Sequence, residues 1–206
     1  MVTQGTAEIA LGGFVVFALL AFGLRAAVHY RRTGTTGFVG ISGRVGSVEW
    51  LGGVLFIVAL AAAVAAPVLQ LAGRVEASPA FDGRWAMAAG IGFYLVGVAA
   101  TLWAQLAMGE SWRIGVDESE RTALVASGPF RWVRNPIYTA MTIATVGLAL
   151  LAPNPLSCIA LVTLIVALEI QVRLVEEPYL SRIHGERYRR WAEQTGRFLP
   201  MIGRMV

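Results

Sequence analysis

The sequence contains no lysine, and it is poor in charge of either sign. Only 15% of its 206 residues are charged and 56% are hydrophobic, whereas a soluble domain carries about 25% charged residues. The mean hydropathy is +0.64, and several apolar runs reach the roughly 20 residues that a helix needs to cross a bilayer. The composition therefore predicts an integral membrane protein.

Residues that commonly form metal sites and nucleophiles are also scarce. Cys158 is the only cysteine, so the chain can form no internal disulfide and no cysteine-based metal site. His29 and His184 are far apart, and neither has a second ligand at a suitable spacing, so we expect no metal. Ser111 and Ser127 have no base in a recognisable motif nearby, and neither a P-loop nor a glycine-rich dinucleotide fingerprint is present. These absences argue against a hydrolase and against a soluble nucleotide-binding domain.

The apolar runs predict an all-α integral membrane protein with about five transmembrane helices and a helical cytoplasmic tail. The residues before the first run lack the basic region of a secretory signal, so we expect this run to stay in the membrane as an anchor. The predicted helices cover residues 8–28, 48–71, 85–108, 137–151 and 156–172, and the polar tail covers residues 173–206.

The arginines predict the orientation of the chain. Fifteen of the 17 lie in residues 25–46, 109–135 and 173–206, whereas only Arg74 and Arg84 lie in the loop 72–84. Basic residues concentrate on the cytoplasmic side of a membrane protein, so five spans with the N-terminus outside explain this split. Because the arginines flank apolar spans and form no single basic face, we expect lipid headgroups and anionic ligands as their partners, and no nucleic acid.

The fourth and fifth segments predict a helical hairpin. About 15 helical residues in the fourth segment cover roughly 22 Å, which is less than a bilayer core of about 30 Å. The hairpin is therefore expected to sit in the cytoplasmic half of the membrane, with residues 153–155 at its tip. Asn154 is predicted to cap the fifth segment, with Pro155 in its first turn.

The first candidate site is the motif Arg134-Asn135-Pro136-x-Tyr138 at the start of the fourth segment. Pro136 suits the first turn of a helix, which makes Asn135 its N-cap. The free N–H groups of this helix end and the charges of Arg131 and Arg134 favour an anion such as a carboxylate. An ordinary helix cap beside cytoplasmic arginines is the alternative interpretation.

The second candidate site is Arg173-x-x-Glu176-Glu177, just after the fifth segment. Arg173 and Glu177 are four residues apart and are predicted to pair on one helix face. The two acids suit an ammonium group or sugar hydroxyls, or they orient a catalytic arginine; a solvated pair that balances nearby arginines is the alternative. Because the hairpin is antiparallel, this stretch and the first candidate site are expected to meet.

Together these stretches resemble the isoprenylcysteine carboxyl methyltransferase family, which is related to the phospholipid N-methyltransferases. The resemblance covers roughly residues 105–200, and the first hundred residues do not contribute to it. One departure is Asn135, which stands where the family usually has histidine. The matching positions are Gly128-Pro129-Phe130, Arg134-Asn135-Pro136-x-Tyr138, Gly147 to Leu150, Asn154, Arg173, Glu176-Glu177, Leu180, and Gly185 to Tyr188.

The resemblance implies a membrane methyltransferase that uses S-adenosylmethionine, with three N-terminal spans in residues 1–104 and a methyltransferase core in residues 105–206. It implies Arg173 and Glu177 as catalytic residues. We expect Trp112 and Arg113 to bind substrate, with the loop 109–135 folded over the pocket, its charged stretch 117–121 included, and Trp112 packed inward. The implied cofactor-binding residues are Arg134, Asn135, Pro136, Tyr138, Glu176, Glu177 and Tyr188.

The expected acceptor is lipophilic, such as the carboxylate of a prenylcysteine-like or isoprenoid substrate. A phospholipid amine and a small thiol stay open as acceptors. Two other functions also stay open: a non-enzymatic membrane scaffold or sensor, and a reductase related in fold to the sterol reductases. The arginine-only, alanine- and glycine-rich composition is typical of a GC-rich prokaryote. The expected location is therefore a prokaryotic cell membrane, with the site facing the cytoplasm.

The arginine distribution yields a topological prediction. Reporter fusions after Gly203 and within the loop 77–82 are expected to report opposite sides of the membrane, because only one of these positions lies on the arginine-rich side. Reporters sensitive to the cytoplasm and to the exterior can be compared in the same cells. Two fusions on the same side would contradict the orientation.

Overall fold

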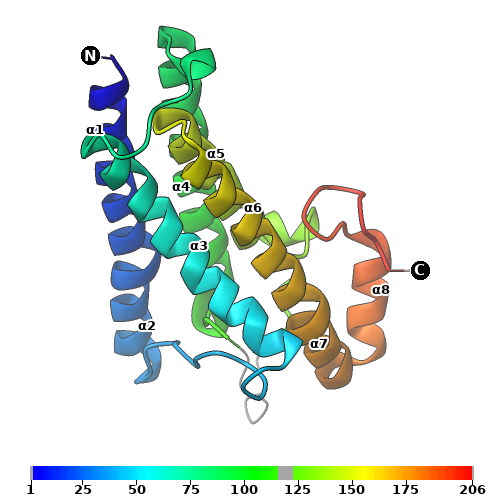
Figure 1. The fold of residues 1–206 in the computed structure, drawn as a ribbon. Coiled ribbons are helices and arrows are strands. Elements are labelled where there is room, and N and C mark those ends of the chain that lie inside the picture. The colour runs from blue at the N-terminus through cyan, green and yellow to red at the C-terminus, as the bar shows by residue number, and fades with distance from the viewer. Residues whose placement is uncertain (1, 116–122, 206) are drawn as a thin grey trace.

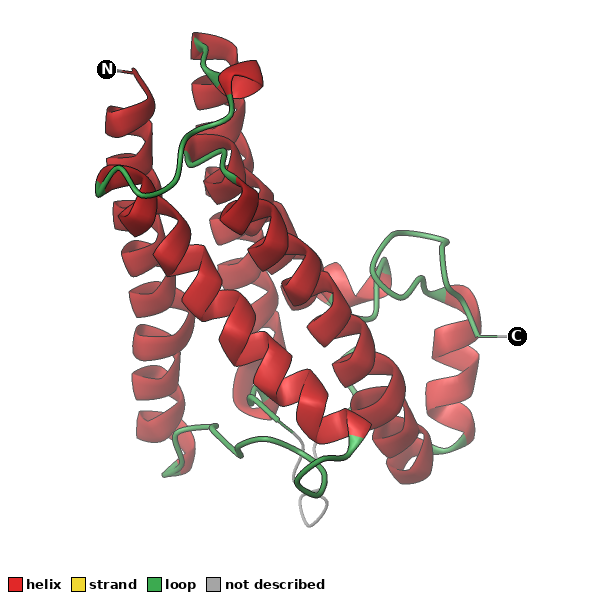
Figure 2. Cartoon of the chain, viewed as in Figure 1, coloured by secondary structure: helices red, strands yellow, loops and turns green. Residues whose placement is uncertain are grey.

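The computed structural model describes residues 2–115 and 123–205, and within them the chain is helical, with only isolated β-bridges (Figures 1 and 2). The predicted charged stretch 117–121 lies outside the described residues. The α-helices are α1 (Val2–Ala18), α2 (Arg25–Thr33), α3 (Val48–Leu71), α4 (Arg84–Met108), α5 (Pro136–Leu151), α6 (Pro155–Ile170), α7 (Glu177–His184) and α8 (Glu186–Gln194). Two π-helical segments interrupt long helices, η1 (Leu19–Leu24) and η5 (Gln171–Glu176), and short 3₁₀ turns are η2 (Pro79–Phe81), η3 (Gly109–Ser111) and η4 (Gly128–Arg131).

Four helical stretches are long and apolar enough to cross a membrane, namely Gln4–Thr33, Val48–Leu71, Arg84–Ser111 and Pro155–His184. The predicted all-α integral membrane fold is therefore confirmed. Helix α5 is apolar but has only 16 residues. The fifth predicted helix was expected to end near residue 172, yet it continues through η5 and α7. Pro178 does not end it: this proline lies just after the junction of η5 with α7, where the π-helical turn departs from the regular α-helical hydrogen-bond pattern.

Small residues bring α4 and α5 into close contact along the bundle (Figure 1). A Cβ atom built on Gly97 would lie 2.4 Å from the backbone nitrogen of Ala144, and one on Gly147 would lie 2.4 Å from that of Tyr94. Such contacts are typical of helices that pack within membranes, where small residues allow two backbones to approach. This packing fixes α5 against α4 and thereby sets where α5 begins.

Asn154 joins the tip of the α5–α6 hairpin to α3. Its Oδ1 accepts hydrogen bonds from the backbone nitrogens of Leu156 at 3.0 Å and Ser157 at 3.1 Å, which confirms the predicted cap. Its Nδ2 donates to the Ala66 carbonyl at 3.1 Å and to Gln70 Oε1 at 2.9 Å. Asn154 is thus fully engaged within the bundle.

These contacts correct the predicted depth of the hairpin. The tip lies against the last turn of α3 and the loop that follows, where Ser78 donates its N–H to the Pro153 carbonyl at 2.6 Å. The hairpin therefore reaches the end of the bundle opposite the C-terminal tail. Since α5 has about half the length of the helix from Pro155 to His184, its first residues lie partway along the bundle. Because α5 does not extend along the whole bundle, space for a site is left beside its first turn.

The contact between α4 and α5 generates a stability prediction. Gly97→Val is expected to lower the free energy of unfolding by about 1–3 kcal/mol or more, because the new side chain must displace the α5 backbone. Gly92→Val is the matched control in the same helix, since a Cβ there meets nothing within 4 Å. Thermal unfolding of both variants in detergent tests this. Similar melting temperatures for the two variants would show that α5 can move away from α4 without loss of stability.

Candidate functional site

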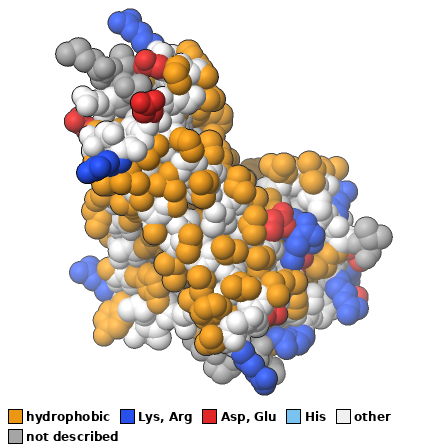
Figure 3. Space-filling model, in the orientation of Figure 1, with side chains coloured by type: hydrophobic (Ala, Val, Ile, Leu, Met, Phe, Trp, Pro, Cys, Tyr) orange, Lys and Arg blue, Asp and Glu red, His pale blue; other side chains and the backbone are white. Residues whose placement is uncertain are grey.

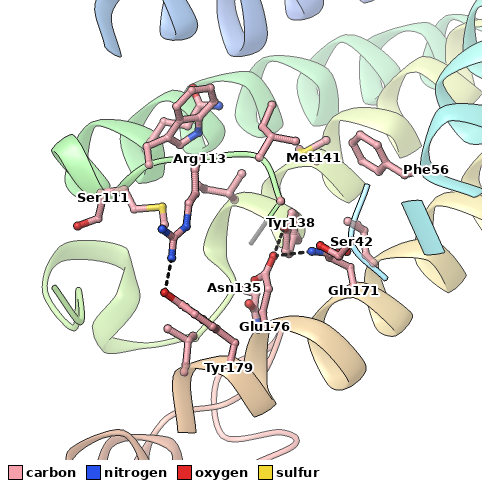
Figure 4. A pocket seen from close by; sticks show the side chains of 18 of the residues that line it. Ser42, Phe56, Ser111, Arg113, Asn135, Tyr138, Met141, Gln171, Glu176 and Tyr179 are labelled. Carbon is pink, nitrogen blue, oxygen red and sulfur yellow. Dashed lines mark hydrogen bonds between the residues drawn. The ribbon is translucent and has the colours of Figure 1, made fainter. Parts of the chain in front are cut away.

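A cavity of about 520 Å³ opens where α5 begins, and it falls in the range of pockets that bind small molecules. Its lining includes the apolar side chains Phe22, Phe56, Ile57, Leu60, Met141 and Leu168. It also includes the polar side chains Arg113, Asn135, Tyr138, Gln171, Glu176 and Tyr179. Figure 4 shows Phe56 and Met141 apart from the Arg113–Tyr179 pair, with Tyr138 and Glu176 between them. The cavity is therefore suited to a ligand, or two ligands, with both polar and apolar parts.

Glu176 is the acidic group of the cavity wall. The Tyr138 hydroxyl donates to its Oε1, and Gln171 Nε2 donates to the same oxygen at 3.4 Å (Figure 4). Within the described residues both hydrogen bonds use Oε1, so Oε2 remains available to a ligand. Gln171 and Glu176 are the ends of η5, and such π-helical turns are frequent at functional sites.

Arg113 is a basic group of the cavity lining. Its Nη2 donates to the Tyr179 hydroxyl at 3.1 Å, and its guanidinium lies 5.4 Å from the centre of the Tyr179 ring. Trp112 beside it is 2% exposed and packs inward, where the Arg25 guanidinium lies 4.8 Å from its ring. The burial predicted for Trp112 is therefore observed.

The loop between α2 and α3 also covers the cavity, which the sequence did not indicate. Its residues Phe38, Gly40, Ile41 and Ser42 belong to the lining. Ile114 donates its N–H to the Gly37 carbonyl at 2.7 Å, and its own carbonyl accepts from the Val39 nitrogen at 2.9 Å. These hydrogen bonds hold the loop against residues 112–115 and give the N-terminal half of the chain a part in the site.

Behind the cavity wall, Glu177 lies between two arginines. Arg134 approaches its Oε1 with Nη2 at 2.7 Å and Nε at 3.2 Å. Arg197 forms a second paired contact, from Nε to Oε1 at 2.8 Å and from Nη2 to Oε2 at 2.9 Å. The hydrogen bond to Glu177 raises the pKa of Arg197 above its ordinary value. We call these three residues the Arg134–Glu177–Arg197 cluster.

Arg134 also holds the C-terminal tail in place. Its side chain donates to the carbonyls of Ala192, Thr195 and Gly203. Its backbone N–H donates to the Gly196 carbonyl at 2.8 Å. All the N–H groups of this buried guanidinium thus donate to the tail or to Glu177, so Arg134 connects the start of α5 to residues 58 to 69 positions later.

Asn135 stands at the N-cap position of α5, but its side chain does not cap the helix. Its Nδ2 and its backbone N–H both donate to the Arg197 carbonyl, each at 3.1 Å. The predicted N-cap position is therefore confirmed, but the side chain makes no capping hydrogen bond, and its amide nitrogen is held against the tail. Asn135 still belongs to the cavity lining.

Arg173 does not pair with Glu177 as its spacing predicted. It forms an ion pair with Glu169, four residues before it, on an exposed surface, because Glu177 is already bound by two arginines. Arg173 lies outside the cavity lining, as do Glu177 and Tyr188. Tyr188 is buried against Trp191, and burial raises the pKa of its hydroxyl well above the ordinary value.

The structure thus divides the predicted site residues into two groups. Those that line the cavity are Trp112, Arg113, Arg134, Asn135, Pro136, Tyr138 and Glu176. Gln171 and Tyr179 were not predicted as site residues, although both lie in or beside the stretch around Glu176 that the sequence singled out. Their side chains could be placed in the cavity only once the course of η5 and α7 was known.

Fold and site together define a helical membrane protein whose ligand cavity lies partway along the bundle, beside a short helix. Residues 85–187 match the family model described as phospholipid methyltransferase, and the chain belongs to this family of membrane methyltransferases. No curated protein matched the chain.

A solved structure of a eukaryotic intramembrane Ras methyltransferase, isoprenylcysteine carboxyl methyltransferase, has a similar fold, with a TM-score of 0.65 and 20% sequence identity. The similarity covers 96% of this chain and 68% of that one. At this identity the comparison shows a shared fold, and with the family match it confirms the resemblance drawn from the motifs.

The cluster generates a prediction about stability. Arg134→Gln is expected to destabilise the protein by about 3–5 kcal/mol, because it breaks a buried ion pair and leaves tail carbonyls without a donor. Arg173→Gln is the control, since an exposed pair of this kind contributes about 0–1 kcal/mol. Thermal unfolding in detergent, together with protease sensitivity of the tail, separates the two. Equal effects would mean that the buried cluster does not hold the tail.

Proposed function

We propose that this protein transfers the methyl group of S-adenosylmethionine to a lipophilic acceptor within the membrane. The observation that carries the proposal is one cavity lined both by apolar side chains and by the charged groups Arg113 and Glu176, in a member of a methyltransferase family. A polar cofactor and an apolar acceptor need such a combination, because methyl transfer requires the two to be held in line and shielded from water.

The polar residues of the lining fit S-adenosylmethionine by their chemistry. Glu176 offers a carboxylate oxygen to an ammonium group or to ribose hydroxyls, and Tyr138 holds that carboxylate in place. When bound, the cofactor supplies an electrophilic methyl group. Arg134, Asn135 and Pro136 shape the floor of the site at the start of α5. Their proposed task is binding and orientation.

Glu177 and Tyr188 have a positioning role in this proposal. Glu177 is bound by Arg134 and Arg197 on the far side of the wall, and Tyr188 packs in the tail that these arginines hold. Neither needs to touch the cofactor to support it. Arg113, which lines the cavity, replaces Arg173 as the cation that we expect to contact the ligands.

A carboxylate on a prenylcysteine-like or isoprenoid molecule is the proposed acceptor. Arg113 can orient such a carboxylate by paired hydrogen bonds, while the chain of the lipid lies along Phe56 and Leu60. The runner-up acceptor is the amine of a phospholipid headgroup, which the family description favours. A small thiol and a non-catalytic sensor that binds the cofactor without turnover are the remaining alternatives.

The proposed location is a cell membrane, with the cavity open toward the cytoplasm, where the cofactor is made. The division into residues 1–104 and a methyltransferase core of residues 105–206 is also a proposal. The cavity draws Phe22, Phe38 and Phe56 from the first part, so we expect the core to require the N-terminal spans for its function.

The acceptor can be identified by incubating the purified protein with methyl-labelled S-adenosylmethionine and membrane lipid extracts. A labelled lipid is the expected product. Mild alkali releases labelled methanol from a methyl ester but leaves N-methyl and S-methyl groups intact, so alkaline release would support the carboxylate. Stable label would favour the amine or thiol, and cofactor binding without any labelled product would favour the sensor.

A prediction about binding follows from Glu176. Glu176→Gln is expected to raise the dissociation constant of S-adenosylmethionine about 10- to 150-fold, because a charge-assisted hydrogen bond contributes roughly 1.5–3 kcal/mol. Glu193→Gln, on the exposed part of α8, is the control. Calorimetric titration measures both variants. An unchanged constant in Glu176→Gln would remove this carboxylate from the cofactor site.

A second prediction separates the two candidate arginines. Arg113→Gln is expected to reduce turnover strongly, because it removes a cation from the cavity lining, whereas Arg173→Gln is expected to stay within a few-fold of the parent. Initial rates at saturating cofactor, with the labelled acceptor, give the comparison. The reverse order of effects would return the catalytic role to Arg173.

A further inference from the structure

The loop that follows α8 exposes an unusual group of large apolar side chains. Leu199 is 52% exposed, Met201 67% and Ile202 63%. The loop turns back from α8 toward the level of α6 instead of leading away from the bundle (Figure 1). A water-exposed tail would be expected to bury or avoid such residues, so this group needs a partner.

The tail loop is joined to a turn that packs against α4, a candidate membrane span. Val133 and Gly196 form a β-bridge, which joins the tail loop to the turn that carries Trp132. Trp132 is 51% exposed, and its ring lies 6.0 Å from that of Trp103 on α4, which is 49% exposed. Exposed tryptophans on α4 and in this turn therefore lie close together, and the turn is joined to the tail loop.

Arginines border this apolar surface. The Arg131 guanidinium lies 5.6 Å from the centre of the Trp132 ring, and Arg204 donates to the Met201 sulfur. Arg187 and Arg190 add exposed positive charge on α8. Figure 3 shows hydrophobic side chains on the upper side of the C-terminal lobe and arginines along its outer and lower sides. Tryptophan with arginine at the border of an apolar surface is typical of the membrane–water interface.

The backbone hydrogen bonds of the tail loop are compatible with a position at the membrane–water interface. Ile202 donates its N–H to the Leu199 carbonyl at 3.2 Å, and its own carbonyl accepts from the Arg197 nitrogen at 2.8 Å. The Phe198 carbonyl accepts from Thr139 Oγ1 at 2.7 Å. Hydrogen-bonded backbone groups are a requirement for chain that enters lipid, because lipid offers no replacement for water.

We propose that residues 198–204, together with Trp132, form an interfacial anchor that inserts into the headgroup and upper acyl region of the bilayer. Interfacial segments bury their apolar face about 5–10 Å deep. The partner is a lipid surface with anionic headgroups, because the bordering charges are arginines, which such a surface attracts. The tail is therefore attached at both ends, to Glu177 through Arg197 and to the membrane through Met201 and its neighbours.

The anchor also bears on the site. Arg197 precedes the inserted loop directly, and its carbonyl is the acceptor of both Asn135 hydrogen bonds. Lipid contact at the loop consequently restrains the backbone that holds the start of α5. The proposal does not depend on which reaction the cavity supports.

The test places a bimane label on single cysteines in the full-length protein, with Cys158→Ser as background because Cys158 is exposed. Met201→Cys and Ile202→Cys report on the loop, and Glu193→Cys on the exposed side of α8 is the matched control. The labelled proteins are reconstituted in vesicles of phosphatidylcholine and phosphatidylglycerol with bromine on the acyl chains. We expect several-fold stronger quenching at positions 201 and 202 than at 193, and more by shallow than by deep bromines.

Aqueous iodide is the complementary quencher, and it is expected to reach position 193 several-fold better than the loop. Loop labels that iodide quenches as well as position 193 would overturn the proposal, because the loop would then lie in water. Loop labels shielded from both iodide and bromine would also overturn it and would identify a second copy of the chain as the cover. Using two loop positions protects the result against one variant that misfolds.

Discussion

The carboxylate of Glu177, held between Arg134 and Arg197, is the interaction on which the site depends. Arg134 precedes α5, Glu177 begins α7 and Arg197 belongs to the tail, so three segments far apart in the sequence converge on one buried group. Buried charges are costly unless each is paired and hydrogen-bonded. Here both carboxylate oxygens and the donors of Arg134 have partners, so the cluster tolerates only one arrangement of these segments.

That arrangement explains why adjacent acids have different tasks. Glu177 is committed to the arginines behind the wall, which leaves Glu176 to turn toward Tyr138 and the cavity. The π-helical turn η5 supports this division, because it changes the direction of successive side chains at the point where the helix passes the start of α5. A structural carboxylate and a carboxylate that lines the cavity thus stand side by side.

The short helix α5 gives the cavity its position. Asn154 fixes the tip of the hairpin at one end of α3, and the glycine contacts fix α5 against α4. With only 16 residues, α5 begins well inside the bundle. The space beneath its first turn receives polar groups from η5 and from residues 112–115 while the surrounding spans supply an apolar wall. A water-soluble group and a lipid chain can therefore meet there.

The sequence by itself determined the fold class, the presence of long apolar helices, the Asn154 cap and the family, because these depend on local hydrophobicity, local capping chemistry and short motifs. It also located the two stretches that contribute Tyr138 and Glu176. Only the tertiary structure decided which charged groups pair. The spacing of Arg173 and Glu177 suggested an ion pair, but Arg134 and Arg197 reach the same carboxylate from distant segments and bury it. Only the tertiary structure also showed that the loop before α3 lines the cavity and that the Asn135 amide binds the tail. Hydrogen bonds between remote segments carry no periodic signal along the chain.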